Sequence, residues 1–240
     1  MYILWCNIVH EIVKGDNMNI PQSTTKTKIL HAAANLFLQI GFEKSTIVRI
    51  ADEAGVSRGS VGFFFKDKEA LLCELVAYVL EGQFEATKKL LENETTDLVL
   101  FYATETVLQL HIAESSEHLR EMYNVSYSLP RSANVIYHTI TTKLEYIFKE
   151  YHKDFKTRDF YELEISTAGI MRNHISVPCD MYFTMDRKVK VFLESTFRVL
   201  QIPDEKINEA ISFVSKFDFE TLSKEVIENM LNYLDSKITK

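Results

Sequence analysis

The chain has 240 residues, of which 46% are hydrophobic and 25% are charged, and its formal net charge is −7. This composition is that of one or two globular domains, and the net charge argues against a protein coated in nucleic-acid contacts. The three cysteines (Cys6, Cys73 and Cys179) form no C-x-x-C pair, so we expect no disulfide framework, no zinc site and a reducing cytoplasm. No apolar run reaches the roughly 18–20 residues that cross a membrane, so no membrane partner is expected.

The first residues of the chain differ from the rest. Residues 1–13 are apolar, but no basic residue precedes them and no small-residue cleavage site follows, which argues against a signal peptide. Residues 14–17 can be encoded by a purine-rich, ribosome-binding type of sequence just ahead of the Met18 codon. We therefore interpret residues 1–17 as untranslated leader, with translation starting at Met18. We treat residues 1–21 as mis-called leader, the alternative being a short extra helix or a disordered arm.

A first helix is predicted from Thr24 to Ile40, because apolar residues recur there at helical spacing and Gly41 provides a stop. A second helix is predicted over 47–54, capped by Ser45 or Thr46.

Gly55 then supplies the positive φ of a turn, and Ser57 caps a third helix from Arg58 to about Phe64. Two short helices joined by a glycine turn are typical of a helix-turn-helix, whose second helix enters the major groove of DNA. The sequence therefore indicates a DNA-reading unit.

Residues 28–72 resemble the TetR family of bacterial transcriptional regulators, over about a fifth of the chain. The resemblance is carried, in register and without a gap, by Ile29-Leu30, Ala33-Ala34, Leu36-Phe37, Gly41-Phe42, Thr46, Ile50-Ala51, Ala54-Gly55-Val56-Ser57, Gly59, Phe65-Lys66, Lys68-Glu69 and Leu71. It implies a double-stranded DNA operator, a small-molecule effector and a homodimer as partners, and no cofactor.

Position by position, the resemblance also implies which residues meet DNA. Arg58 is the best candidate for a bidentate guanine contact, and Lys68 would meet phosphate at a helix start. The expected DNA-binding set is Thr46, Arg49, Ser57, Arg58, Ser60, Val61, Phe63, Phe64, Lys66 and Lys68. An alternative for Lys66 and Lys68 is that they only solvate the start of the next helix.

This chain departs from the family pattern at two positions. The family usually has Tyr at position 62 and often His at 64, where this chain has Gly62 and Phe64. The missing phenol removes a phosphate hydrogen bond, and a glycine inside a short helix costs about 0.5–1 kcal/mol relative to alanine. We therefore expect a modest DNA affinity, and we expect that the operator sequence cannot be inferred from those of relatives.

Beyond residue 72 the periodicity predicts only helices, so the fold class is all-α, with about ten helices in two domains. The expected domains are a DNA-binding unit over 22–72 and an effector-binding and dimerisation domain over 73–240. The first segment carries seven Lys/Arg against five Asp/Glu, and the second carries 19 against 27. A mildly basic head on an acidic body fits a small DNA-binding unit attached to a larger domain. The helices over 158–176 and 185–200 are the expected dimer face.

Polar residues among aromatics are the sequence's only indication of the effector pocket, since such cavities are apolar with a few convergent polar groups. The expected effector-binding set is Tyr123, Asn124, Tyr127, Asn134, His138, Tyr161, Arg172 and His174. Arg172 favours an anionic ligand and the aromatics a flat or cationic one, so the ligand's charge stays open.

We do not expect an enzyme. Residues 55–59 spell G-x-S-x-G, but the nucleophile elbow needs a strand and a sheet that an all-α pattern lacks. The sequence therefore predicts a ligand-responsive repressor that binds a palindromic operator as a dimer and is released by its effector. The alternative is a helical ligand- or partner-binding protein of the same fold whose DNA binding is weakened or lost.

Overall fold

The computed structural model describes residues 24–238, which form eleven helices and no strand, and this confirms the all-α prediction. The predicted leader over 1–21 lies outside the described residues. The helices are α2 (Thr24–Ile40), α3 (Ile47–Glu53), α4 (Arg58–Phe64), α5 (Lys68–Leu91), α6 (Leu98–Glu114), α7 (Glu117–Ser126), α8 (Pro130–Phe148), α9 (Thr157–Ser176), α10 (Met185–Val199), α11 (Asp204–Val214) and α12 (Phe219–Ile238).

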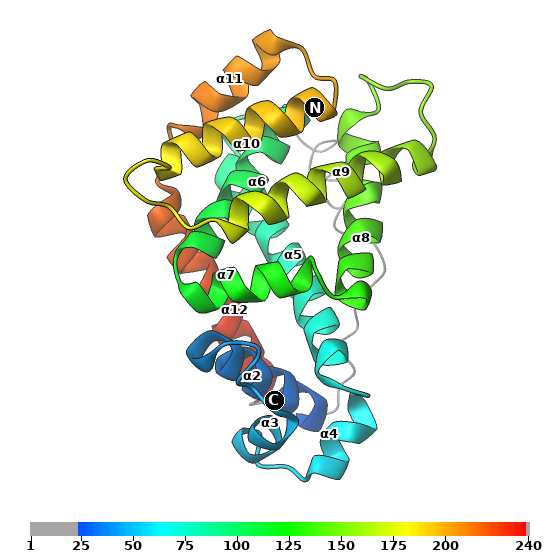
Figure 1. The fold of residues 1–240 in the computed structure, drawn as a ribbon, viewed down its shortest axis with the longest axis vertical. Coiled ribbons are helices and arrows are strands. Elements are labelled where there is room, and N and C mark those ends of the chain that lie inside the picture. The colour runs from blue at the N-terminus through cyan, green and yellow to red at the C-terminus, as the bar shows by residue number, and fades with distance from the viewer. Residues whose placement is uncertain (1–23, 239–240) are drawn as a thin grey trace.

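The molecule is elongated, with a small head at one end and a larger body at the other (Figure 1). We use head for residues 24–66, which include α2, α3 and α4, and body for the helices from α6 to α12. Helix α5 runs without a break from the head into the body, and α12 packs against both α2 and α6. The two ends are therefore joined by two long helices.

The short helices of the head begin and end at residues with a clear local role. The side chain of Thr46 accepts a hydrogen bond from Arg49 N (3.3 Å) and that of Ser57 accepts one from Ser60 N (3.0 Å), so each caps its helix. Gly41 and Gly55 have φ of +83° and +64°, the left-handed region that glycine adopts without strain. The predicted caps and turn of the helix-turn-helix are thus present.

Helix α6 forms the centre of the body. Nearly all of its side chains are buried, because α5, α7, α8, α9, α10, α11 and α12 all pack around it. A helix that is buried on every face forces any polar residue it carries into the interior. Here those residues are Thr104, Glu105, Thr106 and Gln109.

Within residues 24–238, no helix is both long and apolar enough to span a bilayer.

Candidate DNA interface and effector cavity

The lower end of the head presents the start of α4 to solvent. Arg58 and Gly59 are exposed, and Phe63 is 83% exposed, while Val61 of the same helix is fully buried. The hydroxyls of Ser57 and Ser60 lie 2.9 Å apart at the N-terminus of the helix. An exposed helix N-terminus with an arginine in its first turn suits contact with DNA base edges and phosphates.

The predicted DNA-binding residues outside α4 lie on adjoining surfaces. Thr46 and Arg49 are exposed at the start of α3, and Lys66 is exposed in the turn that follows α4. Arg49 Nη1 donates to Lys44 O (3.3 Å), which holds the guanidinium near the loop before α3.

The structure contradicts the prediction for Val61, and it shows how much of Phe63 and Phe64 is exposed. Val61 packs in the core and has no exposed surface, so the prediction that it contacts DNA is wrong. Phe64 is half-buried against the core, with its ring edge-on to that of Phe63 at 5.0 Å between centroids. Phe63 is the more exposed of the two.

Lys68 has a structural role in place of the predicted phosphate contact. Its ammonium donates to Phe42 O (2.7 Å) and Glu43 O (3.4 Å) and lies 4.0 Å above the Phe42 ring. Partial burial lowers the pKa of Lys68, and the nearby carboxylates of Glu121 and Glu43 act in the opposite direction. The lysine therefore fastens the start of α5 to the turn after α2.

Helix α7 of the body is bonded directly to the head. His118 Nδ1 donates to Leu38 O (2.9 Å), and Glu121 Oε1 accepts from Glu43 N (2.9 Å). The first bond reaches the last turn of α2, and the second reaches the loop that follows it. At the other side of the junction, Arg131 at the start of α8 pairs with Asp67 (2.5 Å) and Glu69 (2.9 Å) at the start of α5.

The interior of the body contains a small cavity of about 20 Å³ lined by residues of α5, α6, α8, α9 and α10 and by Tyr127, which follows α7. That volume holds about one water molecule. The aromatic side chains on its wall are Phe84, Tyr102, Tyr127 and Phe192, and the charged or amide-bearing ones are Glu105, Gln109, Lys143 and Glu164. Apolar walls with a few convergent polar groups are the usual make-up of a ligand site.

The polar groups of the cavity are buried and only partly satisfied. Gln109 Nε2 donates to Tyr127 Oη (2.9 Å), and Thr167 Oγ1 donates to Glu164 Oε2 (2.9 Å). Glu105 Oε1 has no hydrogen-bond partner among the described residues, although the side chain is only 3% exposed.

Burial disfavours charge at these groups. It raises the pKa of Glu105 to about 7, against the attraction of Lys143, and it raises the pKa of Glu164 well above its usual range. Burial also lowers the pKa of Lys143 to about 8, although Glu105 and the carboxylates of Glu81 and Glu85 oppose this. The Lys143 ammonium lies 3.1 Å from the centroid of the Phe84 ring.

Of the predicted effector residues, only Tyr127 lines this cavity. Tyr123 and Asn124 lie on α7, the helix just before Tyr127. Tyr123 is buried, and its hydroxyl accepts a hydrogen bond from Gln83 Nε2. The structure does not bring the other members of the set into the cavity. They are Asn134, His138, Tyr161, Arg172 and His174.

These five residues lie elsewhere for identifiable reasons. Asn134, His138 and Arg172 fall on the exposed faces of their helices, and His174 Nδ1 donates to Ile170 O (2.8 Å). His138 packs against the ring of Tyr161, with 5.6 Å between centroids, across the contact of α8 with α9.

Sequence reasoning missed Glu105, Gln109, Lys143 and Glu164. For Glu105 and Gln109 a signal was present, because they interrupt an otherwise apolar helix that had to be buried. For Lys143 and Glu164 no signal in their own helices distinguishes them from solvated charges.

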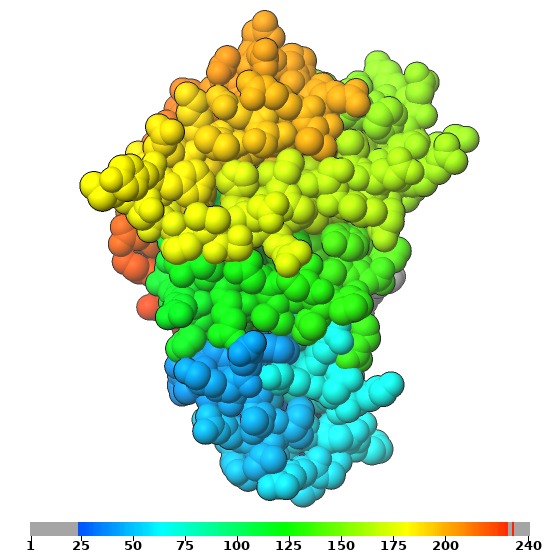
Figure 2. Space-filling view, viewed as in Figure 1, coloured from blue at the N-terminus to red at the C-terminus, as the bar shows by residue number. Residues whose placement is uncertain are grey.

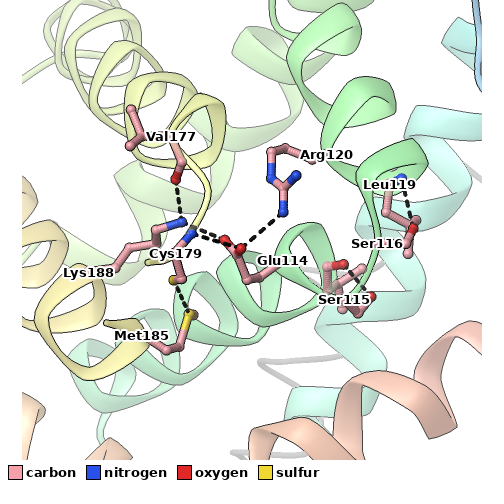
Figure 3. Close-up of polar contacts among 10 residues, drawn as sticks. Glu114, Ser115, Ser116, Leu119, Arg120, Val177, Cys179, Met185 and Lys188 are labelled. Atoms are coloured by element: carbon pink, nitrogen blue, oxygen red, sulfur yellow. Dashed lines mark hydrogen bonds and ion pairs between the residues drawn. The ribbon is translucent and has the colours of Figure 1, made fainter. Parts of the chain in front are cut away.

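The loop between α9 and α10 is joined to the centre of the body by an ion pair with a buried lysine (Figure 3). Lys188 is 1% exposed, and its ammonium donates to Glu114 Oε2 (2.6 Å) and to Val177 O (2.6 Å). Glu114 Oε1 also accepts from Arg120 Nη2 (3.0 Å) and from Cys179 N (2.9 Å). One carboxylate at the end of α6 therefore joins α7, α10 and the α9–α10 loop. Burial alone would raise the pKa of Glu114, but its hydrogen bonds and the charges of Lys188 and Arg120 outweigh burial, and the pKa is lowered.

The same loop and the two helices beside it carry exposed apolar side chains. In the space-filling view, the loop forms the yellow projection beside the faces of α9 and α10 (Figure 2). Met181 and Tyr182 are 81% and 77% exposed, and Ile165 of α9 and Val191 of α10 are 46% and 40% exposed.

Comparison with known proteins bears on the head most strongly. Residues 29–75 match the family model described as bacterial regulatory proteins, tetR family. The chain is 35% identical over 68 residues to the HTH-type transcriptional regulator YerO of Bacillus subtilis, covering 28% of this chain and 24% of that protein. It is 30% identical over 95 residues to the HTH-type transcriptional regulator UidR of Escherichia coli K12, covering 40% and 47%. The chain thus matches less than half the length of these curated relatives.

Two solved structures resemble most of the chain in fold. RolR in complex with resorcinol superposes with a TM-score of 0.63 at 16% identity, over 80% of this chain and 94% of that one. The TetR-family repressor FadR of Thermus thermophilus, in complex with lauroyl-CoA, superposes with a TM-score of 0.52 at 23% identity, over 72% and 92%. At these identities the likeness shows the fold alone.

Proposed function

We propose that the chain is a TetR-family repressor that binds a palindromic operator as a homodimer and is released by a small effector, and the match of residues 29–75 to the tetR family model supports this proposal. The observation that carries this proposal is the exposed N-terminus of α4. Arg58 stands there in solvent, one residue after the cap Ser57, while Val61 of the same helix is locked in the core. Such a helix is rigidly held and free to enter a groove.

A dimer is part of the proposal because one seven-residue recognition helix reads few bases. Two copies spaced about one DNA turn (~34 Å) apart read a palindrome. Exposed apolar side chains on α9, on α10 and on the loop between them support these two helices as the interface, since large exposed apolar residues are common where proteins associate.

The bonds between α7 and the head give the effector a route to the DNA. Tyr127 follows the last residue of α7 and lines the cavity, while His118 and Glu121 near the start of α7 hold the head. A ligand that shifts Tyr127 would move a rigid helix whose other end is bonded to α2. Such a ligand changes operator affinity only by its preference for one of the two arrangements.

The alternative function, a binding protein of this fold with weakened DNA binding, is favoured by Gly62. It is exposed on α4, and a Cβ added there would meet nothing within 4 Å, so no packing constraint explains the glycine.

Binding to the DNA upstream of the chain's own gene tests the two functions, because such regulators often control themselves. The wild-type protein is compared with Arg58→Ala and with Lys89→Ala, which removes one positive charge from an exposed position of α5 in the body. The repressor function predicts a salt-sensitive complex that Arg58→Ala weakens by about tenfold or more, while Lys89→Ala leaves it unchanged. Equal, salt-insensitive or undetectable binding by all three proteins supports the alternative.

A further inference from the structure

The side chains that line the cavity of the body indicate the chemical class of its ligand. Its walls bring two carboxyl groups, Glu105 and Glu164, to an aromatic interior, together with one ammonium group, Lys143. Burial favours the protonated form of Glu164, so Glu105 is the carboxyl group that more readily carries a negative charge beside Lys143. An anionic ligand would meet two carboxyl groups for every ammonium.

One polar atom of the cavity wall lacks a hydrogen-bond partner. Glu105 Oε1 is buried without a partner in the described part of the chain. A buried acceptor without a donor costs free energy, which a ligand that brings N–H groups recovers. Such a ligand needs donors, and an ionised carboxylate group provides none at neutral pH.

Lys143 already occupies the place that a ligand cation would take. Its ammonium lies against the face of Phe84, 3.1 Å from the ring centroid, and it interacts electrostatically with Glu105. The face of an aromatic ring attracts cations, so this position suits any compact positive group. The Lys143 ammonium also interacts electrostatically with Glu81 and Glu85, whose carboxylates are exposed on α5.

Lys143 can leave the cavity without losing every partner. The lysine stem is long and flexible, and the carboxylates of Glu81 and Glu85 lie towards solvent. The present volume of about 20 Å³ is far below the roughly 300 Å³ or more of a drug-sized ligand site. Outward movement of this side chain would free space beside Phe84 and Glu105, where the unpartnered acceptor lies.

We propose that the cavity binds a small aromatic cation bearing N–H donors, such as an amidine or an amine, and that Lys143 is a tethered cation which the ligand displaces. Glu105 receives the cationic group of the ligand, and Phe84, Tyr102 and Phe192 enclose its ring. The burial that raises the pKa of Glu105 and lowers that of Lys143 supports this assignment, because the resident pair is poorly stabilised near neutral pH. The inference rests on the proposed function, since it names the effector class of that regulator.

Three probes of nearly the same shape test the class of ligand: benzamidine, benzamide and benzoate, which are a cation, a neutral amide and an anion. Calorimetric titration of the full chain without DNA is expected to show benzamidine binding about tenfold or more tightly than benzamide, and no binding of benzoate. Preference for benzoate, equal binding of benzamidine and benzamide, or binding of none of the three would overturn the proposal.

Variants test the role of Lys143. Lys143→Met removes the resident cation and is expected to tighten benzamidine binding about tenfold, whereas a ligand that pairs with Lys143 would bind more weakly. Glu105→Gln is expected to weaken benzamidine binding by a similar factor, and Glu162→Gln, at an exposed position of α9, serves as its control.

Because Glu105→Gln leaves Lys143 buried without its carboxylate, the double variant Glu105→Gln/Lys143→Met is measured as well. This variant carries neither charge, and its thermal unfolding midpoint reports whether it is folded. It is expected to bind benzamidine no better than benzamide, and retention of the wild-type preference would contradict the assignment of Glu105.

These titrations do not depend on DNA binding, so the two proposals can fail separately. An Arg58-dependent complex with operator DNA and no preference for benzamidine would refute the ligand class alone. Benzamidine binding that follows the variants as predicted, with no DNA complex, would refute the regulator alone.

Discussion

His118 Nδ1 of α7 donates a hydrogen bond to Leu38 O in the last turn of α2, at 2.9 Å. The two residues are 80 positions apart, and the bond joins the body to the DNA-reading head. One turn further along α7, Glu121 accepts from Glu43 N, so a single helix face holds both the end of α2 and the loop after it. The position of the head therefore depends on the position of α7.

Glu121→Ala is expected to loosen the loop after α2. The Glu43 amide loses its acceptor, so its hydrogen exchange should become faster while exchange in α9 stays unchanged. Mass-spectrometric hydrogen exchange measures this, with Glu117→Ala at an exposed position of the same helix as the control. Unchanged exchange of the segment containing Glu43 would show that the bond does not hold the loop.

Gly41→Ala is expected to destabilise the protein by about 1–3 kcal/mol. The residue has φ of +83°, and an added Cβ would come 2.2 Å from Glu121 Oε2, so both backbone and neighbour oppose a side chain. Urea denaturation measures the change in the free energy of unfolding. In Gly41→Ala/Glu121→Ala the clash is gone but the strain of the positive φ stays, so stability should recover only in part.

Gly62→Ala, in contrast, is expected to stabilise the protein by about 0.5–1 kcal/mol, because this glycine lies inside a helix with open space around it. The same denaturation measurement checks the sign. Gly62→Tyr is expected to strengthen DNA binding by restoring a phenol near the phosphates. A Gly62→Tyr protein whose affinity for DNA is unchanged would show that the glycine does not limit binding.

The stability of the body is expected to fall as the pH rises from about 4.5 towards 7. In the unfolded chain Glu105 ionises at its usual pKa of 4.5, but burial raises its pKa in the folded protein to about 7. Between these values the folded state binds more protons than the unfolded state. The stabilisation from the protonated carboxyl is therefore fully present below the pKa of the unfolded chain, and it is lost as the pH rises through the pKa of the folded protein.

Thermal unfolding across this pH range measures the effect. Glu105→Gln cannot ionise and should flatten the slope, whereas Glu162→Gln should keep the wild-type slope. A Glu105→Gln slope as steep as that of the wild type would assign the pH dependence to other groups.

The head was predictable from the sequence because its signals are local. Thr46, Gly55 and Ser57 each determine the backbone within a few residues of themselves, and the helices that they bound begin within one residue of the predicted positions. The cavity was not predictable in the same way. Whether a polar residue such as Arg172 faces solvent or Glu164 faces the interior depends on how α9 is rotated against its neighbours, which is a property of packing.

Lys68 shows the same limit within the head. Its position at a helix start suggested a phosphate contact. In the structure its ammonium donates to Phe42 O and lies over the Phe42 ring, and Phe42 is 26 residues earlier in the chain. A contact over that separation leaves no trace in the local pattern.

The most direct test of the central claim is a nuclease footprint of the full chain on the DNA upstream of its own gene. A dimeric repressor predicts two protected half-sites related by twofold symmetry, about one helical turn apart, and protection that Arg58→Ala abolishes at the same protein concentration. Ile165→Glu, which places a charge on the proposed dimer face, should weaken both half-sites together. Protection of a single site, or none at any upstream position, would contradict the account.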